Sequence, residues 1–498
     1  MVASTAATVP SDLRTKFEGW GQSHVFKFID NGMCSEEEAQ TLIEQLKRID
    51  YPSIEASVEK VPLVIFVDFL RSVPQAKEDL KSETADADYE PPNDNDVMKL
   101  SAMTPEDVKR WEALGLSAVA AGQVAGCVLA GGQGSRMGLG VHESKGMVNI
   151  GLPSAKPIFQ LFTERLTRLK TLSGKPSARL PFLVMTSPLN HSSVKQFFKD
   201  HDFFGYPQED VVFFPQGTLP ALSLDGNLIL ESKSKVSVSP DGNGGLYYAL
   251  EKEGVLSKLE AWGVKYLHVF SVDNAILKPA DPWFVGYCIE KNAQVGNKVV
   301  WKSSWDEKVG VIATKNGKCS VVEYSDLYNP AAGIDNPMVR AVGEDGKLLF
   351  GAGNICNHFY SVGFLRDAIS RMNSRYHLAY KKIASADEKG ETVKPKSNNG
   401  VKLEAFIFDA FEMAERSVVF ECKREEEFTP IKNPSGADQD SPDTARKAIS
   451  DMCKRWIETA GGHVVGEDLF EVSPLVSYRG EGLEELCKDK TFASPGQL

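Results

Sequence analysis

Short apolar runs alternate with amphipathic segments from about residue 124 onwards. A short apolar run bounded by turn residues predicts a buried strand, and apolar residues at helical spacing predict a helix. The runs predict strands over Val124–Ala130, Leu180–Thr186, Val211–Phe214, Tyr266–Val272 and Lys298–Lys302. The intervening segments predict helices over Pro157–Leu169, Ser192–Asp200 and Gly244–Glu253. This alternation predicts an α/β fold around a mainly parallel sheet, in which ligands bind at the carboxyl ends of strands.

The flanking regions carry clear local signals. Glu36–Ile49 has apolar residues at helical spacing, and Thr104 with Pro105 begins another predicted helix. Asn316-Gly317 lies between two apolar runs and predicts a hairpin that extends the sheet with antiparallel strands. Ser441 starts an amphipathic helix whose apolar stripe we assign to core packing. Because 498 residues exceed the usual size of one core, we expect two or three domains.

Composition narrows the class of protein. The formal net charge of −12 argues against nucleic acid or an anionic membrane as the main partner, so any phosphate site must be a local basic pocket. Eight scattered cysteines form no C-x-x-C pair, which disfavours a zinc site and fits a reducing compartment. The N-terminus lacks the pattern of a signal peptide, and no apolar stretch is long enough to span a bilayer. We therefore expect a cytoplasmic protein.

A glycine-rich segment, Gly131 to Gly138, follows the first predicted strand of the sheet. Glycines let the backbone turn sharply and approach a ligand closely, which a Cβ would prevent. Arg136 adds a cation whose donors suit phosphate oxygens, and Lys145 follows nearby. A glycine-rich turn alone can be structural. The two cations shift the interpretation toward a site for a nucleotide phosphate chain.

Two better-known phosphate loops do not fit this segment. In the dinucleotide fingerprint G-x-G-x-x-G the third glycine would fall at Met137, which disfavours an NAD-dependent dehydrogenase. The Walker loop requires Gly-Lys-Ser/Thr, and that string does not occur in the chain.

Other candidate residues allow both a structural and a functional interpretation. Asp241–Gly245 precedes a predicted helix, so it is either a tight turn with an N-cap or a helix start that binds an anion. Asp273 ends a predicted strand and either caps the next segment or binds Mg²⁺ through its hard oxygens. Lys145, Lys402 and Lys432 are surface lysines by pattern alone.

Several motifs together resemble those of the eukaryotic UDP-N-acetylglucosamine (UDP-N-acetylhexosamine) pyrophosphorylases. They are Gly131–Gly138, Pro240–Gly245, Ser271–Asn274, Val322–Ser325, Gly353–Phe359, Phe428–Asn433 and Ser473–Tyr478. The resemblance runs from about Asp107 to the C-terminus. It implies a Rossmann-like nucleotidyltransferase domain with a central mixed, mainly parallel sheet, which we place over residues 122–410. A mostly helical N-terminal domain (1–121) and a C-terminal domain (411–498) would flank it.

The resemblance implies that UTP and N-acetylglucosamine 1-phosphate are converted into UDP-N-acetylglucosamine and pyrophosphate. The cofactor would be Mg²⁺, with Mn²⁺ as an alternative, held by Asp273. The residues implied to contact UTP are Leu129, Ala130, Gly131, Gly132, Lys145, Gln216, Gly242, Asp273 and Lys402. Those implied to contact the sugar phosphate are Asn243, Glu323, Tyr324, Asn354 and Lys432. Arg136, Lys145 and Lys432 would act in catalysis, and the protein would be a monomer or a weak homodimer.

The chain departs from the family pattern around the lysine of the glycine-rich loop. Ser135 stands where the family usually has Thr, and Ser144 precedes Lys145 where the family usually has Pro. The segment from Gly138 to Lys145 is about two residues longer, an insertion that a surface loop accommodates at little cost.

Two alternatives to this activity stay open. One is a UDP-glucose or broad UDP-sugar pyrophosphorylase, although Glu323, Tyr324 and Asn354 favour an N-acetylated sugar. N-acetylgalactosamine 1-phosphate stays open as a second substrate. The other is an inactive nucleotide-sugar sensor, which the presence of Arg136 and Asp273 disfavours.

Overall fold

The protein is described by a computed structural model over residues 8–49, 89–132, 134–140, 142–329, 334–372 and 376–498. The chain divides into two compact units. Unit 1 combines the described residues of Met1–Ala87 with Gly217–Gly245 and Met372–Asp409. Unit 2 combines the described residues of Asp88–Gln216, Leu246–Arg371 and Ala410–Leu498. The three-domain division made from the sequence stays a prediction.

The central sheet of unit 2 follows the strand order β2-β22-β12-β17-β11-β3-β4-β5. These strands are β2 (Val97–Met98), β22 (Ser417–Glu421), β12 (Val295–Trp301), β17 (Ala352–Ser361), β11 (Tyr266–Ser271), β3 (Val124–Leu129), β4 (Phe182–Thr186) and β5 (Val211–Pro215). Strands β11, β3, β4 and β5 run parallel, as do β12, β22 and β2. Strand β17 runs antiparallel to both β11 and β12. The predicted mixed, mainly parallel sheet is confirmed.

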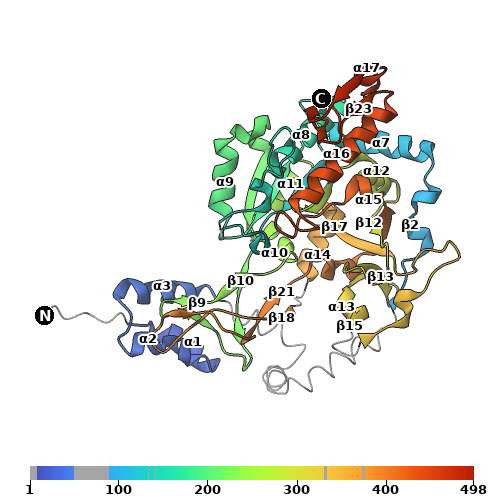
Figure 1. Cartoon of the computed structure of the whole chain (residues 1–498). Coiled ribbons are helices and arrows are strands. Elements are labelled where there is room, and N and C mark those ends of the chain that lie inside the picture. Colours follow the sequence, from blue (N-terminus) through green and yellow to red (C-terminus); the bar gives the residue numbers. More distant parts are fainter. Residues whose placement is uncertain (1–7, 50–88, 133, 141, 330–333, 373–375) are drawn as a thin grey trace. The chain divides into compact units, whose positions relative to one another are not determined.

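The innermost strands form where the sequence is continuously apolar. All residues of β3 and β4 are buried, as expected of parallel strands that are covered on both faces. Helices α8 (Ile158–Leu172), α9 (His191–Asp200) and α12 (Pro282–Glu290) contribute side chains to the same core (Figure 1). The predicted strands and helices of this region are confirmed, with small differences at their ends.

Two glycines allow helices α7 (Pro105–Ala120) and α12 to pack in close contact. A Cβ on Gly115 would lie 2.2 Å from Pro282 O, and a Cβ on Gly286 would lie 1.9 Å from Trp111 O. Neither position accepts a side chain without a backbone shift. The start of α12 is therefore held firmly against α7.

The predicted hairpin is confirmed as β13 (Val311–Lys315) and β14 (Lys318–Val322), which pair antiparallel. Its two turn residues, Asn316 and Gly317, have φ values of 51° and 73°. Positive φ at both turn positions is the geometry for which Asn-Gly is preferred. Strand β13 also pairs with β17, so the hairpin extends the central sheet.

Strand β17 is a long strand that the sequence analysis did not predict. Asn354, Asn357 and His358 interrupt its apolar residues. Asn357 and His358 are nevertheless buried, because Asn357 Oδ1 bonds His268 Nε2 at 2.6 Å and His358 Nδ1 bonds Asn297 Oδ1 at 2.8 Å. Partners on neighbouring strands thus bond one polar atom of each side chain, which a local apolar pattern cannot reveal, while Asn357 Nδ2 and His358 Nε2 have no hydrogen-bond partner among the described residues.

Unit 1 has its own apolar core. Helices α1 (Ser11–Gly19), α2 (Lys27–Asp30) and α3 (Glu36–Lys47) contribute to it, and α3 confirms the predicted helix at Glu36. Unit 1 also contains the short strands β6 (Thr218–Pro220), β7 (Leu222–Ser223), β8 (Leu230–Ser232), β9 (Lys235–Val236), β10 (Val238–Pro240), β18 (His377–Lys381) and β21 (Gly400–Glu404). Strands β18, β21 and β7 form a three-stranded antiparallel sheet.

The C-terminal helix α16 (Pro442–Thr459) begins at the predicted Ser441 cap, and its stripe packs into the core of unit 2. All eight cysteines are free. Within the part of the chain that the structure describes, no helix combines the length and apolar character needed to cross a membrane.

Candidate active site

The carboxyl ends of four parallel strands meet at one edge of the central sheet. Ser271 of β11 pairs with Leu129 of β3, and Leu129 pairs with Met185 of β4. The glycine-rich loop after β3 and Asp273 after β11 therefore leave the sheet at neighbouring positions. Leu129 and Ala130, the last residues before the loop, are buried. Open α/β sheets bind ligands at such an edge.

Gly131 lies against the side chain of Gln216, which follows β5 and is 6% exposed. A Cβ on Gly131 would lie 2.2 Å from Gln216 Oε1 and 3.2 Å from Ser187 N. At Gly132 the situation is the opposite, since the residue is exposed and a Cβ there would meet no described atom within 4 Å. Packing within the protein thus requires glycine at position 131, whereas position 132 is open to a ligand.

One carbonyl group, at the start of the glycine-rich loop, binds the residue just before Lys145. Ala130 O accepts hydrogen bonds from Ser144 Oγ and from Asn190 Nδ2, each at 3.1 Å. Asn190 Oδ1 in turn accepts from Ser187 N at 2.8 Å. These bonds fix where the chain leaves β3 and where it returns just before Lys145.

The segment before Lys145 is attached to the start of α9 at His142. His142 Nδ1 bonds Leu189 O at 2.8 Å, and Ser193 Oγ donates to His142 O. His142 is therefore held beside α9, and the backbone after it continues into the candidate site.

Lys145 and Asp273 form an ion pair in this site. Lys145 Nζ lies 3.4 Å from Asp273 Oδ2 and donates to Ile431 O at 2.7 Å. The two side chains are 16% and 19% exposed, so both charges are only partly solvated. Asp273 Oδ1 accepts from Ser271 Oγ at 2.8 Å. The structure thus brings together a cation and a carboxylate that the sequence analysis assigned to phosphate and metal.

The segment that carries Lys432 lies along the turn that carries Asp273. Ile431 N donates to Asp273 O at 2.8 Å, and Asn274 forms a backbone bridge with Pro430. The side chain of Asn274 also bonds the backbone of Glu427 and of Thr429, just before this segment. Lys432 is half-buried and follows directly after Ile431. Main-chain bonds therefore fix the Lys432 backbone next to Asp273.

Arg136 lies in the one-turn helix η4 (Ser135–Met137), and its side chain is exposed. The guanidinium is therefore open to solvent in the glycine-rich loop. Its proposed contact with phosphate stays a prediction.

Glu323 and Asn354 converge on Gly310. Val311 of β13 pairs with Val322 of β14 and also with Gly353 of β17, so the residues next to each of these lie close together. Asn354 N donates to Gly310 O at 2.8 Å, and a Cβ on Gly310 would lie 3.2 Å from Glu323 Oε1. Two of the four residues assigned to the sugar in unit 2 thus flank Gly310, Glu323 directly after β14 and Asn354 on β17.

Tyr324 follows Glu323 at the start of α13 (Tyr324–Leu327) and is 40% exposed. Cys356 follows Asn354 on β17, where its N–H donates to Asn354 Oδ1 at 3.0 Å, and its φ is 52°. Burial, and then the negative charge of Asp273, raise the pKa of the Cys356 thiol to about 12, so the thiol is neutral at physiological pH. Asp273 is therefore near β17 at Cys356, two residues after Asn354.

Gly242, Asn243 and Lys402 belong to unit 1. Gly242 has a φ of 90°, and a Cβ there would lie 2.3 Å from Ala405 O. Asn243 Oδ1 accepts from Ile407 N at 2.9 Å, which supports the tight-turn interpretation of this segment. Lys402 is half-buried in β21. The binding roles of these three residues stay predictions.

The donor groups fit a metal that arrives with its substrate. In the described ranges, no three His, Cys, Asp or Glu side chains are grouped to hold a metal ion. Mg²⁺ in nucleotide sites is held by one or two carboxylates together with phosphate oxygens and water. Asp273, a partly exposed carboxylate beside the loop, can supply one such ligand. The site therefore suits a metal that is carried mainly by phosphate groups.

The sequence analysis missed several residues that shape this site. Ser144, Asn190 and Asn274 hold backbone groups, and each lies inside or beside a quoted motif or a predicted helix. Arg165 on α8 donates to Ala275 O at 2.7 Å and to Leu277 O at 2.9 Å. Its only sequence signal is a charged residue on the apolar face of a predicted helix.

Comparison with known proteins extends the resemblance seen in the motifs. A family model described as UTP–glucose-1-phosphate uridylyltransferase matches residues 66–479. The UDP-N-acetylhexosamine pyrophosphorylase-like protein 1 of Xenopus tropicalis is 40% identical, over 99% of this chain and 97% of its own length. The UDP-N-acetylglucosamine diphosphorylase 2 of Arabidopsis thaliana is 36% identical, over 97% of this chain and 93% of its own.

The fold agrees with these sequence matches. The crystal structure of the uridine diphosphate N-acetylglucosamine pyrophosphorylase from Trypanosoma brucei, in complex with an inhibitor, gives a TM-score of 0.78 at 29% identity. The match covers 96% of this chain and 95% of that chain. The chain therefore belongs to the UTP–glucose-1-phosphate uridylyltransferase family.

Proposed function

We propose that the protein transfers a uridylyl group from UTP to N-acetylglucosamine 1-phosphate, forming UDP-N-acetylglucosamine and pyrophosphate. The observation that carries this proposal is the Lys145–Asp273 pair at the carboxyl edge of the sheet, 3.4 Å apart and beside the Gly131–Gly138 loop. A cation for phosphate and a carboxylate for a metal lie together there. The names of relatives that are 36–40% identical support an N-acetylated sugar as the acceptor.

The reaction on this proposal is a single displacement. An oxygen of the sugar phosphate attacks the α-phosphorus of UTP, the bond from that phosphorus to the bridging oxygen breaks, and the electron pair leaves on pyrophosphate. No side chain has to remove a proton, because the attacking phosphate is already ionised at neutral pH. Both reactants are anions, so the protein has to reduce their repulsion and align them. Mg²⁺ bound with the nucleotide supplies additional charge neutralisation.

The side chains then have separate tasks. Lys145 and Arg136 neutralise the phosphates that leave as pyrophosphate, and Lys432 binds the phosphate of the sugar. Lys145 Nζ bonds Ile431 O at 2.7 Å in the free protein, so a bound phosphate would share or replace that bond. Glu323 and Asn354, on either side of Gly310, present a carboxylate and an amide to the sugar. The free cysteines fit a cytoplasmic location.

The test is pyrophosphate release from UTP with a panel of sugar 1-phosphates. N-acetylglucosamine 1-phosphate should be turned over faster than glucose 1-phosphate in the presence of Mg²⁺, and N-acetylgalactosamine 1-phosphate shows whether the acceptor site is strict. Faster turnover of glucose 1-phosphate would identify the UDP-glucose alternative instead. UTP binding without turnover of any sugar would identify the nucleotide-sugar sensor. Replacing Mg²⁺ by Mn²⁺ in the same assay compares the two metals.

A further inference from the structure

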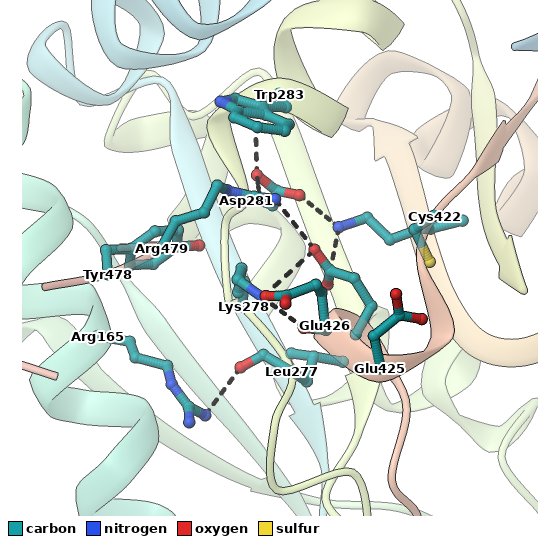
Figure 2. Close-up of polar contacts among 12 residues, drawn as sticks. Arg165, Leu277, Lys278, Asp281, Trp283, Cys422, Glu425, Glu426, Tyr478 and Arg479 are labelled. Atoms are coloured by element: carbon teal, nitrogen blue, oxygen red, sulfur yellow. Dashed lines mark hydrogen bonds and ion pairs between the residues drawn. The ribbon is translucent and has the colours of Figure 1, made fainter. Parts of the chain in front are cut away.

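Buried charged side chains contact one another on the segments that follow Asp273 and precede Lys432 (Figure 2). These side chains belong to a group of three cations and two carboxylates, which we call the ion cluster: Lys278, Lys298, Arg479, Asp281 and Glu427. The two lysines and the two carboxylate residues are each at most 2% exposed. Charges this deeply buried need paired partners, and the sequence analysis assigned none of them a role.

Arg479 links the two carboxylates of the ion cluster. One nitrogen of its guanidinium bonds Asp281 Oδ1, and the other, Nη1, donates to Glu427 Oε1 at 3.2 Å. The guanidinium carbon also lies over the ring of Trp283, 4.0 Å from the ring centre (Figure 2). This contact further restricts the orientation of the guanidinium. The preceding Tyr478 donates its hydroxyl to Pro279 O at 2.9 Å. A planar guanidinium bridges two carboxylates through two separate nitrogens in a fixed geometry, whereas an ammonium, such as that of Lys298, does so through a single atom.

Glu427 connects the ion cluster to the Lys432 segment. It ends α15 (Arg424–Glu427), and its carbonyl accepts from Asn274 Nδ2 at 2.6 Å. Asn274 Oδ1 accepts from Thr429 N at 3.0 Å, so one side chain holds both sides of the turn after α15. This turn leads directly to Ile431, whose N–H bonds Asp273 O and whose carbonyl bonds Lys145 Nζ.

Asp281 connects the same cluster to the other side of the site. It caps α12, accepting from Trp283 N at 3.1 Å, and it ends the turn that begins at Asp273. Arg165 fixes the middle of that turn through Ala275 O and through Leu277 O, and Figure 2 shows the contact with Leu277. The two segments that carry Asp273 and Lys432 are therefore joined at a second place, through Arg479.

The charge balance of the cluster does not depend on Arg479. Without its guanidinium, two lysines would face two carboxylates: Lys298 contacts Asp281 and lies 3.2 Å from Glu427, and Lys278 lies 3.6 Å from Glu427. Buried ion pairs add little net stability over apolar replacements, so neutrality alone does not explain this arginine. What Arg479 adds is a second connection between Asp281 and Glu427, beside the one through Lys298, made by two separate nitrogens of one rigid group.

We propose that Arg479 is a positioning residue for the transfer reaction. By joining Asp281 to Glu427 it holds the segment from Glu427 to Ile431 against Asp273, and through Ile431 O it holds Lys145. The proposal rests on the proposed function for the roles of Asp273 and Lys145. It makes the C-terminal segment part of the apparatus that aligns the substrates.

The test compares Arg479→Gln with Arg455→Gln. Arg455 pairs with Glu426 of the same short helix, at 2.9 Å, but from its exposed side, so it is a matched control. Arg479→Gln should lower kcat about 10- to 100-fold, the usual effect of losing a residue that orients a metal ligand. The Mg²⁺ concentration for half-maximal rate should rise, whereas Arg455→Gln should leave both quantities unchanged. Hydrogen exchange in the peptide spanning Glu427–Ile431 should become faster in the first variant only.

A second variant keeps the test decisive. Arg479→Lys retains the charge but replaces the two nitrogens that contact Asp281 and Glu427 by one, so its kcat should lie between those of the unchanged protein and Arg479→Gln. If Arg479→Gln does not fold, the lysine variant carries the comparison. A folded Arg479 variant with unchanged kcat and unchanged local exchange would overturn the proposal, and so would exchange that rises uniformly across unit 2. If the unchanged protein and the control both release no pyrophosphate, the proposed function fails, while the exchange comparison still tests the bridge.

Discussion

Gly131 and Gly132 are adjacent in the loop, and adding one methyl group to each should have different consequences. At Gly131 the new Cβ would lie 2.2 Å from Gln216 Oε1, far inside normal contact, and 3.2 Å from Ser187 N. Gln216 is 6% exposed and has little room to rotate away. At Gly132 the Cβ would meet no described atom within 4 Å. Neither glycine has a positive φ, so alanine fits the backbone at both positions.

The magnitude for Gly131→Ala follows from which atom is displaced. Overpacking a buried site costs about 1–3 kcal/mol, and the low half of that range applies here because the main clash is with the end of a side chain. We therefore expect Gly131→Ala to lower the free energy of unfolding by about 1–2 kcal/mol and to weaken UTP binding by moving Gln216. Gly132→Ala should leave the stability of the free protein unchanged and weaken UTP binding only, because the added methyl meets the ligand.

Thermal unfolding without ligand and calorimetric titration with UTP separate these effects. An unchanged unfolding midpoint for Gly131→Ala would refute the close approach to Gln216. Unchanged UTP affinity in Gly132→Ala would refute the contact between the loop and the nucleotide. Each variant is a control for the other, because both add one methyl group to the same loop.

Three further predictions address separate features. Asp273→Asn keeps the shape of the side chain but removes the metal-binding charge, so kcat should fall about 1000-fold in the pyrophosphate assay; turnover within about tenfold of the unchanged protein would contradict the metal role. Burial lowers the pKa of His268 from its ordinary 6.5 to about 4, so the unfolded chain binds a proton first as the pH falls. About 3 kcal/mol of stability should therefore be lost between pH 6.5 and pH 4, and urea unfolding of His268→Gln should show a smaller loss; an equal loss would contradict this assignment. Gly317→Ala places a Cβ at a φ of 73° in the hairpin turn and should cost about 1 kcal/mol in the same unfolding assay, whereas no loss would contradict the turn geometry.

The sequence predicts the fold best where local signals suffice. Strand β3 is apolar throughout, Thr104 supplies a helix cap, and Asn316-Gly317 matches a two-residue turn; all three are found. Strand β17 is different, because Asn357 and His358 are buried only by virtue of His268 and Asn297 on neighbouring strands. The composition of unit 1 from three distant segments is equally invisible to a local pattern.

In the candidate site, too, some residues could be predicted from the sequence and others could not. The resemblance assigns Lys145 to phosphate and Asp273 to a metal, and the structure brings their side chains within 3.4 Å. The residues that hold these groups come from far along the chain. Arg165, Glu427 and Arg479 meet only in the folded protein, so spacing along the sequence could not associate them.

The double hydrogen bond at Ala130 O has a consequence for the kinetics of binding. A loop that Ser144 joins to Ala130, and that Asn190 fixes to the segment after β4, has fewer conformations to lose when a nucleotide arrives. Ligand binding then leaves this frame unchanged and adds contacts to its exposed residues, such as Gly132 and Arg136. A frame that is formed before the ligand arrives favours rapid capture of UTP, because association is slower when binding requires a conformational change.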